Sequence, residues 1–259
     1  MTLIKGKSLN FIYFIIFIRK GRLFVLFKSS NKQVSLLFLF ITCFFVTCLL
    51  ISNIIAGKLI EVFGITLPAA VIIFPITYLF GDIITEVYGF KRARLVIWIG
   101  FLANFFMITI FFLTISLPYP DFWESQQAFV SVLGFTPRVV IASLIAYFVG
   151  EFSNSIVLSK MKILTKGRWL WTRTIGSTLV GEGIDTVLFI AIAFGDMLPF
   201  SVVSSMILAQ YIWKVGYEIL ATPFTYMMVN WVKCKEGIDR YDIGVSYNPF
   251  GLEVKDETV

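Results

Sequence analysis

Residues 35–57 read SLLFLFITCFFVTCLLISNIIAG and contain no charged side chain. The hydrocarbon core of a bilayer is about 30 Å thick, and a helix needs about 20 mainly apolar residues to cross it. This stretch is both long enough and apolar enough, so it predicts a transmembrane helix.

Five further apolar runs of similar character follow it. They cover residues 67–88, 93–117, 138–158, 174–195 and 200–232. The last run is long for one span, and Pro223 near its end either kinks it or lets it continue as a tilted or interfacial segment. The predicted fold class is therefore an all-α integral membrane protein, a bundle of six transmembrane helices.

The composition argues against a soluble protein and against most enzyme classes. Hydrophobic residues make up 58% of the chain and charged residues only 15%, whereas soluble domains are about 25% charged. Histidine is absent, which removes the commonest general base and metal ligand, and the three cysteines lack a metal-binding spacing. The sequence also has no P-loop, so the chain cannot itself couple to ATP hydrolysis. We expect no enzyme activity, no cofactor and no metal.

Basic residues cluster at alternate ends of the predicted helices. All but three of the 22 Lys and Arg residues lie in the N-terminal segment, the turn at residues 89–94, the loop at residues 159–173 and the C-terminal tail. Cytoplasmic loops carry an excess of Lys and Arg, so both termini are predicted to be cytoplasmic. This placement explains the net charge of +6 without a nucleic-acid partner.

Three regions are predicted along the chain. Residues 1–34 form a basic and apolar segment whose apolar part, Leu9–Ile18, is too short to span a bilayer and is expected to be cytoplasmic, interfacial or loosely ordered. Residues 35–232 form the six-helix transmembrane domain, and residues 233–259 form a cytoplasmic tail. The longest outer loop, residues 118–137, is rich in proline and aromatic residues, which suit an interfacial loop or a short lid.

Seven ionisable residues lie inside the predicted spans, where charged groups are rare and mark functional sites. They are Asp82, Glu86, Glu151, Glu182, Asp185, Lys214 and Glu218. Most of them form pairs that lie three or four residues apart in the sequence, and the two members of such a pair lie on one helix face. We expect these faces to meet in a shared polar chamber between the bilayer midplane and the cytoplasmic side. The alternative is a set of packing ion pairs, with Arg94 and Arg173 reaching some of the carboxylates.

Amide and aromatic residues complete the predicted chamber. Tyr78 lies one helical turn before Asp82. The other candidates are Asn53, Asn104, Asn154, Gln210 and Tyr211. A carboxylate accepts two hydrogen bonds and an aromatic face stacks on a flat ring, so this set suits a planar heterocycle that bears N–H donors. Ordinary helix packing also explains any single Tyr or Phe here.

Several motifs match a known family. They are Asn53-Ile-Ile-Ala-Gly-Lys58, Phe80-Gly-Asp82-x-x-Thr-Glu86-Val-Tyr-Gly89 with Arg94, Gly150-Glu-x-x-Asn154-Ser, Lys160-x-Lys162, Trp171-x-Arg173-Thr-x-x-Ser177-Thr178, Gly181-Glu182-x-x-Asp185-Thr186, Lys214-x-x-x-Glu218 and Asp239-x-Tyr-Asp242. With these motifs, residues 35–250 resemble the queuosine precursor transporters, also called the vitamin uptake transporter family. The first 34 residues lie outside the resemblance.

The resemblance implies a multi-pass protein of the inner (plasma) membrane that imports a base for queuosine modification of tRNA. The implied substrate is 7-cyano-7-deazaguanine or 7-aminomethyl-7-deazaguanine, or else queuine. The predicted substrate-binding residues are Asp82, Glu182, Asp185, Lys214, Glu218, Tyr78, Asn53, Asn104 and Asn154. By residue type, Asp82, Glu182 and Asp185 would accept hydrogen bonds from the base edge. Lys214 would donate to the ring carbonyl, with Glu218 positioning it.

Three classes of function stay open. A secondary carrier or facilitator is the leading hypothesis, and its acidic residues are compatible with proton coupling. A substrate-capture subunit of an ATP-driven importer is the second, for which Ala142-x-x-x-Ala146 is a weak docking signal. An intramembrane enzyme is the third, because Gly81-Asp82 is half of an aspartyl-protease motif. Besides the base, the expected partner is membrane lipid, and a homo-oligomer is compatible with the sequence.

Overall fold

The computed structural model describes residues 11–19, 22–30, 35–56, 58–62, 65–134 and 137–251. Residues 1–40 and 41–259 form two separate compact units. The first contains an antiparallel hairpin of β1, Phe11–Arg19, and β2, Arg22–Ser30. The expectation that this segment is cytoplasmic or interfacial stays a prediction. Isoleucine, phenylalanine and tyrosine dominate β1, and these residues favour strands. The remaining residues of the 1–34 segment lie outside the described residues.

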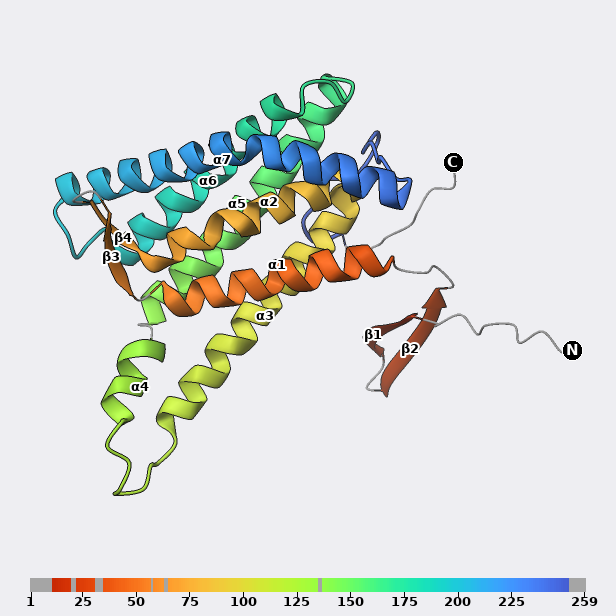
Figure 1. The fold of residues 1–259 in the computed structure, drawn as a ribbon. Helices are drawn as coiled ribbons and strands as arrows, with labels where there is room; N and C mark the ends of the chain where they lie inside the picture. The colour runs from red at the N-terminus through yellow and green to blue at the C-terminus, as the bar shows by residue number, and fades with distance from the viewer. Residues whose placement is uncertain are drawn as a thin grey trace, which may run out of the picture. The chain divides into compact units, whose positions relative to one another are not determined.

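The second unit is mainly helical (Figure 1). After α1, Leu36–Ile55, the chain makes a short hairpin of β3, Leu59–Val62, and β4, Ile65–Pro68, which was not predicted. The helices that follow are η1 Ala69–Ile72, α2 Phe74–Ile83, η2 Ile84–Tyr88, α3 Phe90–Ser116, α4 Gln126–Leu133, α5 Pro137–Leu164, α6 Leu170–Phe194 and α7 Phe200–Glu236. Each of the six predicted runs therefore coincides with helix.

Within the part of the chain that the structure describes, four helical segments are long and apolar enough to cross a membrane. They are Leu36–Ile55, Phe90–Ser116, Gln126–Leu164, which contains α4 and α5, and Leu170–Phe194. Their outer surfaces expose many large apolar side chains, among them Phe106 and Phe112 of α3, as expected for helices that face lipid. The prediction of a helical membrane protein is thus confirmed.

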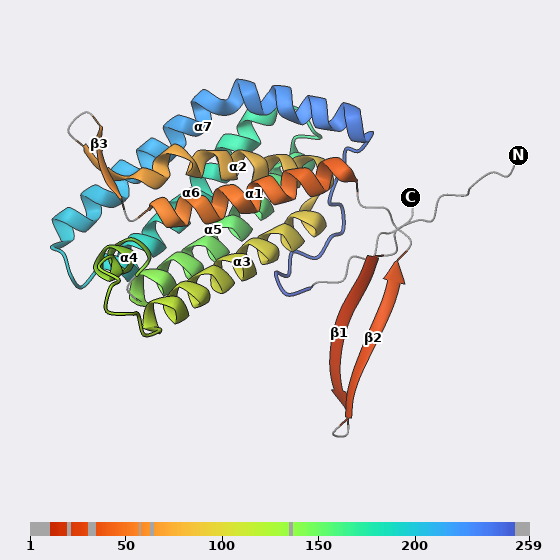
Figure 2. The ribbon, with the colours of Figure 1, turned by 60° about the horizontal axis from the view of Figure 1, so that its bottom comes forward.

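The predicted run at residues 67–88 is helical but irregular. It begins as a 3₁₀ turn, continues as α2 and ends in the π-helical turn η2. Pro75 occupies the first turn of α2, where its missing N–H removes no helical hydrogen bond. In both views α2 lies alongside α1 (Figures 1 and 2).

Glycine allows α5 and α6 to cross at close range. A Cβ atom on Gly150 would lie 2.8 Å from the Cβ of Asp185, and one on Gly181 would lie 2.6 Å from the Cβ of Asn154. Real side chains do not approach so closely, so both positions need glycine, as at other membrane helix crossings. The crossing thereby brings polar residues of the two helices together in the interior.

The chain after α7 folds back onto the bundle. Asp242 accepts hydrogen bonds from the backbone N–H of Phe90, at 2.9 Å, and from the hydroxyl of Ser159, at 2.6 Å. Arg94 donates to the carbonyl of Asn248 at 2.9 Å. The predicted tail is therefore docked through residue 251. Inside α7 lies Pro223, and Figure 2 shows the bend in this helix that the proline predicts.

Candidate functional site

The helical unit encloses a cavity of about 370 Å³. Its walls come from α1, α2, α3, α5, α6 and α7, and they are mostly apolar and aromatic. This volume lies within the roughly 300–1,000 Å³ that is typical of small-molecule pockets. The polar groups that reach the cavity gather at two places, which differ in charge.

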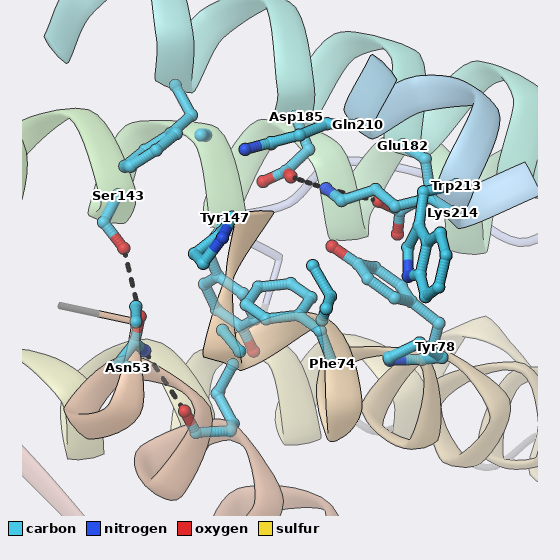
Figure 3. Close-up of a pocket in the computed structure, with 18 of the residues that line it drawn as sticks. Asn53, Phe74, Tyr78, Ser143, Tyr147, Glu182, Asp185, Gln210, Trp213 and Lys214 are labelled. Carbon is cyan, nitrogen blue, oxygen red and sulfur yellow. Dashed lines mark hydrogen bonds and ion pairs between the residues drawn. The ribbon is translucent and has the colours of Figure 1, made fainter. Parts of the chain in front are cut away.

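The first polar group joins α6 to α7 through Lys214 (Figure 3). The Nζ atom of Lys214 lies 2.6 Å from Oδ2 of Asp185 and 2.8 Å from Oε2 of Glu182. The two acids lie three residues apart on α6 and so share a face. The ammonium also lies 5.2 Å from the ring centroid of Phe74 and 5.8 Å from that of Tyr78, within cation–π range. We call Lys214, Glu182 and Asp185 the charged triad.

The second polar group is neutral. Asn53 donates from Nδ2 to Oδ1 of Asn104 at 2.7 Å, and the hydroxyl of Ser143 donates to Oδ1 of Asn53 at 3.4 Å. Asn104 in turn donates to the carbonyl of Gly100 at 3.1 Å. Because Asn104 fixes the Asn53 amide from behind, Asn53 and Ser143 present an oriented amide and hydroxyl toward the cavity (Figure 3).

The predicted site residues divide into two sets. Those that line the cavity are Asn53, Tyr78, Glu182, Asp185, Lys214 and Glu218. The others are Asp82, Asn104 and Asn154, which are buried outside the lining. Asn154 donates to Oδ1 of Asp82 at 2.7 Å, so these two residues pair with each other instead of facing the cavity.

Sequence reasoning missed several lining residues. Ser143, Phe74, Tyr147 and Trp213 contribute a hydroxyl and aromatic surface to the cavity. Nothing in their spacing marks them, because Ser, Phe, Tyr and Trp are common in membrane helices and at their ends. Gln210, predicted as part of the chamber, does line the cavity, whereas Tyr211 does not and donates to the carbonyl of Leu179 at 3.2 Å.

A separate ion-pair cluster surrounds Glu86, which is fully buried in η2. Arg173 binds both carboxylate oxygens, with Nε at 2.7 Å from Oε2 and Nη2 at 2.8 Å from Oε1. Lys233 lies 2.7 Å from Oε1, and Lys162 lies 3.6 Å from the same atom. Glu86 is thus a packing ion pair, one of the two alternatives that the sequence left open, and Arg173 reaches it as anticipated.

Asp239 extends this cluster into the docked tail. It lies 2.6 Å from the Nζ of Lys162 and 2.9 Å from the Nζ of Lys233. Partial burial opposes its ionisation, but the hydrogen bonds from the two lysines outweigh that effect and hold the pKa of the Asp239 carboxyl below its usual value. The contact of Asp239 with two lysines of the bundle was not predicted, although its motif was noted.

Comparison with known proteins places the chain in a family. The profile described as putative vitamin uptake transporter matches residues 68–228. A protein of Bacillus subtilis named probable queuosine precursor transporter is 29% identical over 177 residues, which cover 68% of this chain and 77% of that protein. The queuosine precursor transporter of Escherichia coli is 26% identical over 166 residues, 64% of this chain and 72% of that protein. No solved structure matches. The chain therefore belongs to the vitamin uptake transporter family, which its sequence motifs predicted.

Proposed function

We propose that this protein imports a queuosine precursor across the inner (plasma) membrane as a secondary carrier or facilitator. The names of the Bacillus subtilis and Escherichia coli relatives support this substrate class. The observation that carries the proposal is the charged triad at the wall of an aromatic cavity. The proposed substrates are 7-cyano-7-deazaguanine, 7-aminomethyl-7-deazaguanine or queuine.

The cavity chemistry matches the edge of a 7-deazaguanine base. Such a base carries adjacent N–H donors beside a ring carbonyl. Glu182 and Asp185 offer acceptors for the donors, and Lys214 offers a donor for the carbonyl. These three residues pair with one another, so a bound base would insert its edge between groups that are already aligned. Preorganised charges of this kind lose little entropy on binding.

Aromatic residues would hold the faces of the flat ring. Phe74 and Tyr78 lie beside the Lys214 ammonium, and Trp213 and Tyr147 also line the cavity. Aromatic pairs favour offset stacking or edge-to-face contact, each worth about 0.5–1.5 kcal/mol beyond the buried area. The neutral group of Asn53 and Ser143 would then be available to the substituent at position 7.

The proposed topology has six spans with both termini in the cytoplasm. The six predicted runs coincide with α1, the α2–η2 segment, α3, α5, α6 and α7, and the basic residues alternate as cytoplasmic loops require. In this topology residues 35–232 form the transporter domain, and the Glu86 cluster lies at its cytoplasmic end. A reporter fused after residue 259 and a second in the loop at residues 118–125 test the two opposite locations.

A test of the site changes one carboxylate of the charged triad. Asp185→Asn removes the charge but keeps the shape, and Glu182 still pairs with Lys214, so the protein should remain folded in the membrane. We expect it to lose uptake of labelled 7-deazaguanine bases and to lose binding in a panel that includes guanine and queuine. Asp121→Asn, in an exposed loop, is the matched control. Normal uptake by Asp185→Asn would remove this site.

The second hypothesis, a capture subunit for an ATP-driven module, loses its weak docking signal. Ala142 and Ala146 were the candidate docking face, but they are 0% and 1% exposed and so already pack inside the bundle. Uptake by proteoliposomes that contain this chain alone would reject the hypothesis completely. Absence of uptake together with tight base binding would favour it.

A further inference from the structure

Three buried carboxyl groups lie near the cavity without a cationic partner. Asp82, Glu151 and Glu218 are 0%, 2% and 3% exposed. Each has one oxygen, Asp82 Oδ2, Glu151 Oε2 and Glu218 Oε1, with no hydrogen-bond partner among the described residues. None of the ion pairs found in that part of the chain includes them. A buried carboxylate without a partner is strongly unfavourable, so something outside the described side chains must neutralise them.

Glu86 differs from these three carboxyl groups because it has cationic partners. Glu86 lies one helical turn after Asp82, and Arg173, Lys233 and Lys162 surround it within 4 Å. Among the residues that the structure describes, the side chain that hydrogen-bonds to Asp82 is the neutral amide of Asn154. The described part of the chain thus supplies three cations to Glu86 and none to Asp82. A permanent packing role would call for the same compensation at both positions.

A metal ion does not fit the three carboxyl groups. Among the residues that the structure describes, no three His, Cys, Asp or Glu side chains converge as metal ligands. Ca²⁺ and Mg²⁺ need six or more oxygen ligands in a defined geometry. A proton needs only one carboxylate oxygen, and each of these groups has one free.

The three groups also belong to the electrostatic environment of the cavity. Glu218 lines the cavity and lies one turn from Lys214 on α7. The α2 helix, which carries Asp82, packs against α7, which carries Glu218 and Lys214, and against α5, which carries Glu151. Both α5 and α7 pack against α6, which carries Glu182 and Asp185. Lys214 is the one cation among these facing groups in the described residues, and Tyr78 of α2 is the neutral titratable neighbour.

We propose that Asp82 and Glu218 form a proton-binding site beside the substrate cavity and that proton entry drives import of the base. The inference rests on the proposed function and adds its energy source. Glu218 exchanges protons with the cavity that it lines, and Asp82 exchanges them with Glu218 across the α2–α7 contact. Protonation makes the pair neutral, and the loaded carrier then moves less uncompensated charge through the bilayer.

The test uses purified protein in liposomes with 7-cyano-7-deazaguanine, whose cyano group does not ionise. The membrane potential is clamped with potassium and valinomycin, and the outside is made more acidic by about one pH unit. Each coupled proton should raise accumulation about tenfold, because one pH unit is a tenfold concentration ratio. Addition of the base should also acidify a pyranine-containing lumen.

Asp82→Asn, which lies outside the cavity lining, should lose both the accumulation and the pyranine signal but keep base binding and the exchange of labelled for unlabelled base. Glu218→Gln should also lose the accumulation and the pyranine signal. Glu124→Gln, in an exposed loop, should behave like the wild type. Uptake that ignores the pH gradient, uptake driven by sodium, or gradient-driven accumulation in both variants would overturn the proton site. If a variant does not fold, the wild-type pyranine signal still tests whether protons enter together with the base. Absence of base binding by the wild type would instead overturn the proposed function.

Discussion

The contrast between Glu86 and Asp82 gives a quantitative prediction. Glu86→Gln keeps the side-chain size but removes the charge that Arg173, Lys233 and Lys162 share. Removing one partner of a buried ion pair destabilises a protein by about 3–5 kcal/mol, because the opposite charge is left buried. Here the positive charges that remain exceed the negative ones, since only Asp239 remains as an acid in the cluster. We expect a loss within that range.

The matched control is Asp82→Asn, one turn earlier on the same helix. Asp82 contacts no cation among the described residues, and its hydrogen-bond donor is the amide of Asn154, which can also bond to asparagine. The change should alter the free energy of unfolding by less than about 1.5 kcal/mol, the usual scale of one neutral hydrogen bond. Both variants keep the helix and the side-chain volume, so the comparison isolates charge.

Thermal unfolding in detergent, followed by size-exclusion recovery, measures the difference. For a chain of this size a change of 1 kcal/mol shifts Tm by about 2–4 °C. Glu86→Gln should therefore lower Tm by about 6–20 °C, and Asp82→Asn by a few degrees at most. Equal losses at the two positions would refute the reasoning, because they would mean that Asp82 is also held as a compensated charge.

Three further predictions follow from single contacts. Gly181→Ala should lower Tm because its Cβ would meet α5 at 2.6 Å, whereas Gly216→Ala, with no atom within 4 Å, should be neutral or raise it. Lys214→Met should weaken base binding about 10- to 150-fold in a direct titration, because it removes one charged hydrogen bond worth about 1.5–3 kcal/mol. The substitution also leaves Glu182 buried without its cation. The pKa of Asp239 is lowered in the docked form, so its ionised carboxylate stabilises docking of the tail. This stabilisation is complete above the usual carboxyl pKa of about 4 and is lost as the pH falls through the lower pKa of the docked form. Limited proteolysis of the tail against pH measures this loss, and Asp239→Asn should abolish the pH dependence.

Hydropathy predicted the helical segments because burial in lipid depends on composition over about 20 residues, which a sequence displays directly. It could not predict the docking of the tail, since the contacts of Asp239 and Asp242 join residues about 80 to 150 positions apart. Helical periodicity predicted that Asp82 and Glu86 share one face. Periodicity does not identify partners, however, and the two residues have different ones.

The charged triad was predicted only in part. Spacing put Glu182 and Asp185 on one face, but the sequence made Glu218 the residue that positions Lys214, whereas Lys214 pairs with Glu182 and Asp185. The neutral group of Asn53 and Ser143 depends instead on how α1, α3 and α5 meet. That arrangement is a property of packing, and the polar residues of a single helix do not reveal it.

Three residues at four-residue intervals make the α2–η2 segment the link between the cavity and the opposite end of the bundle. Tyr78 faces the cavity, Asp82 pairs with Asn154, and Glu86 holds the cation cluster. Glu86 lies within the π-helical turn η2, and such turns are frequent at functional sites. A movement of the whole α2–η2 segment that opened the Glu86 cluster would displace Asp82 and Tyr78 as well, because the three residues lie on consecutive turns. Such a movement would shift the proposed proton site and the substrate wall together, which is the mechanical condition for coupling one to the other.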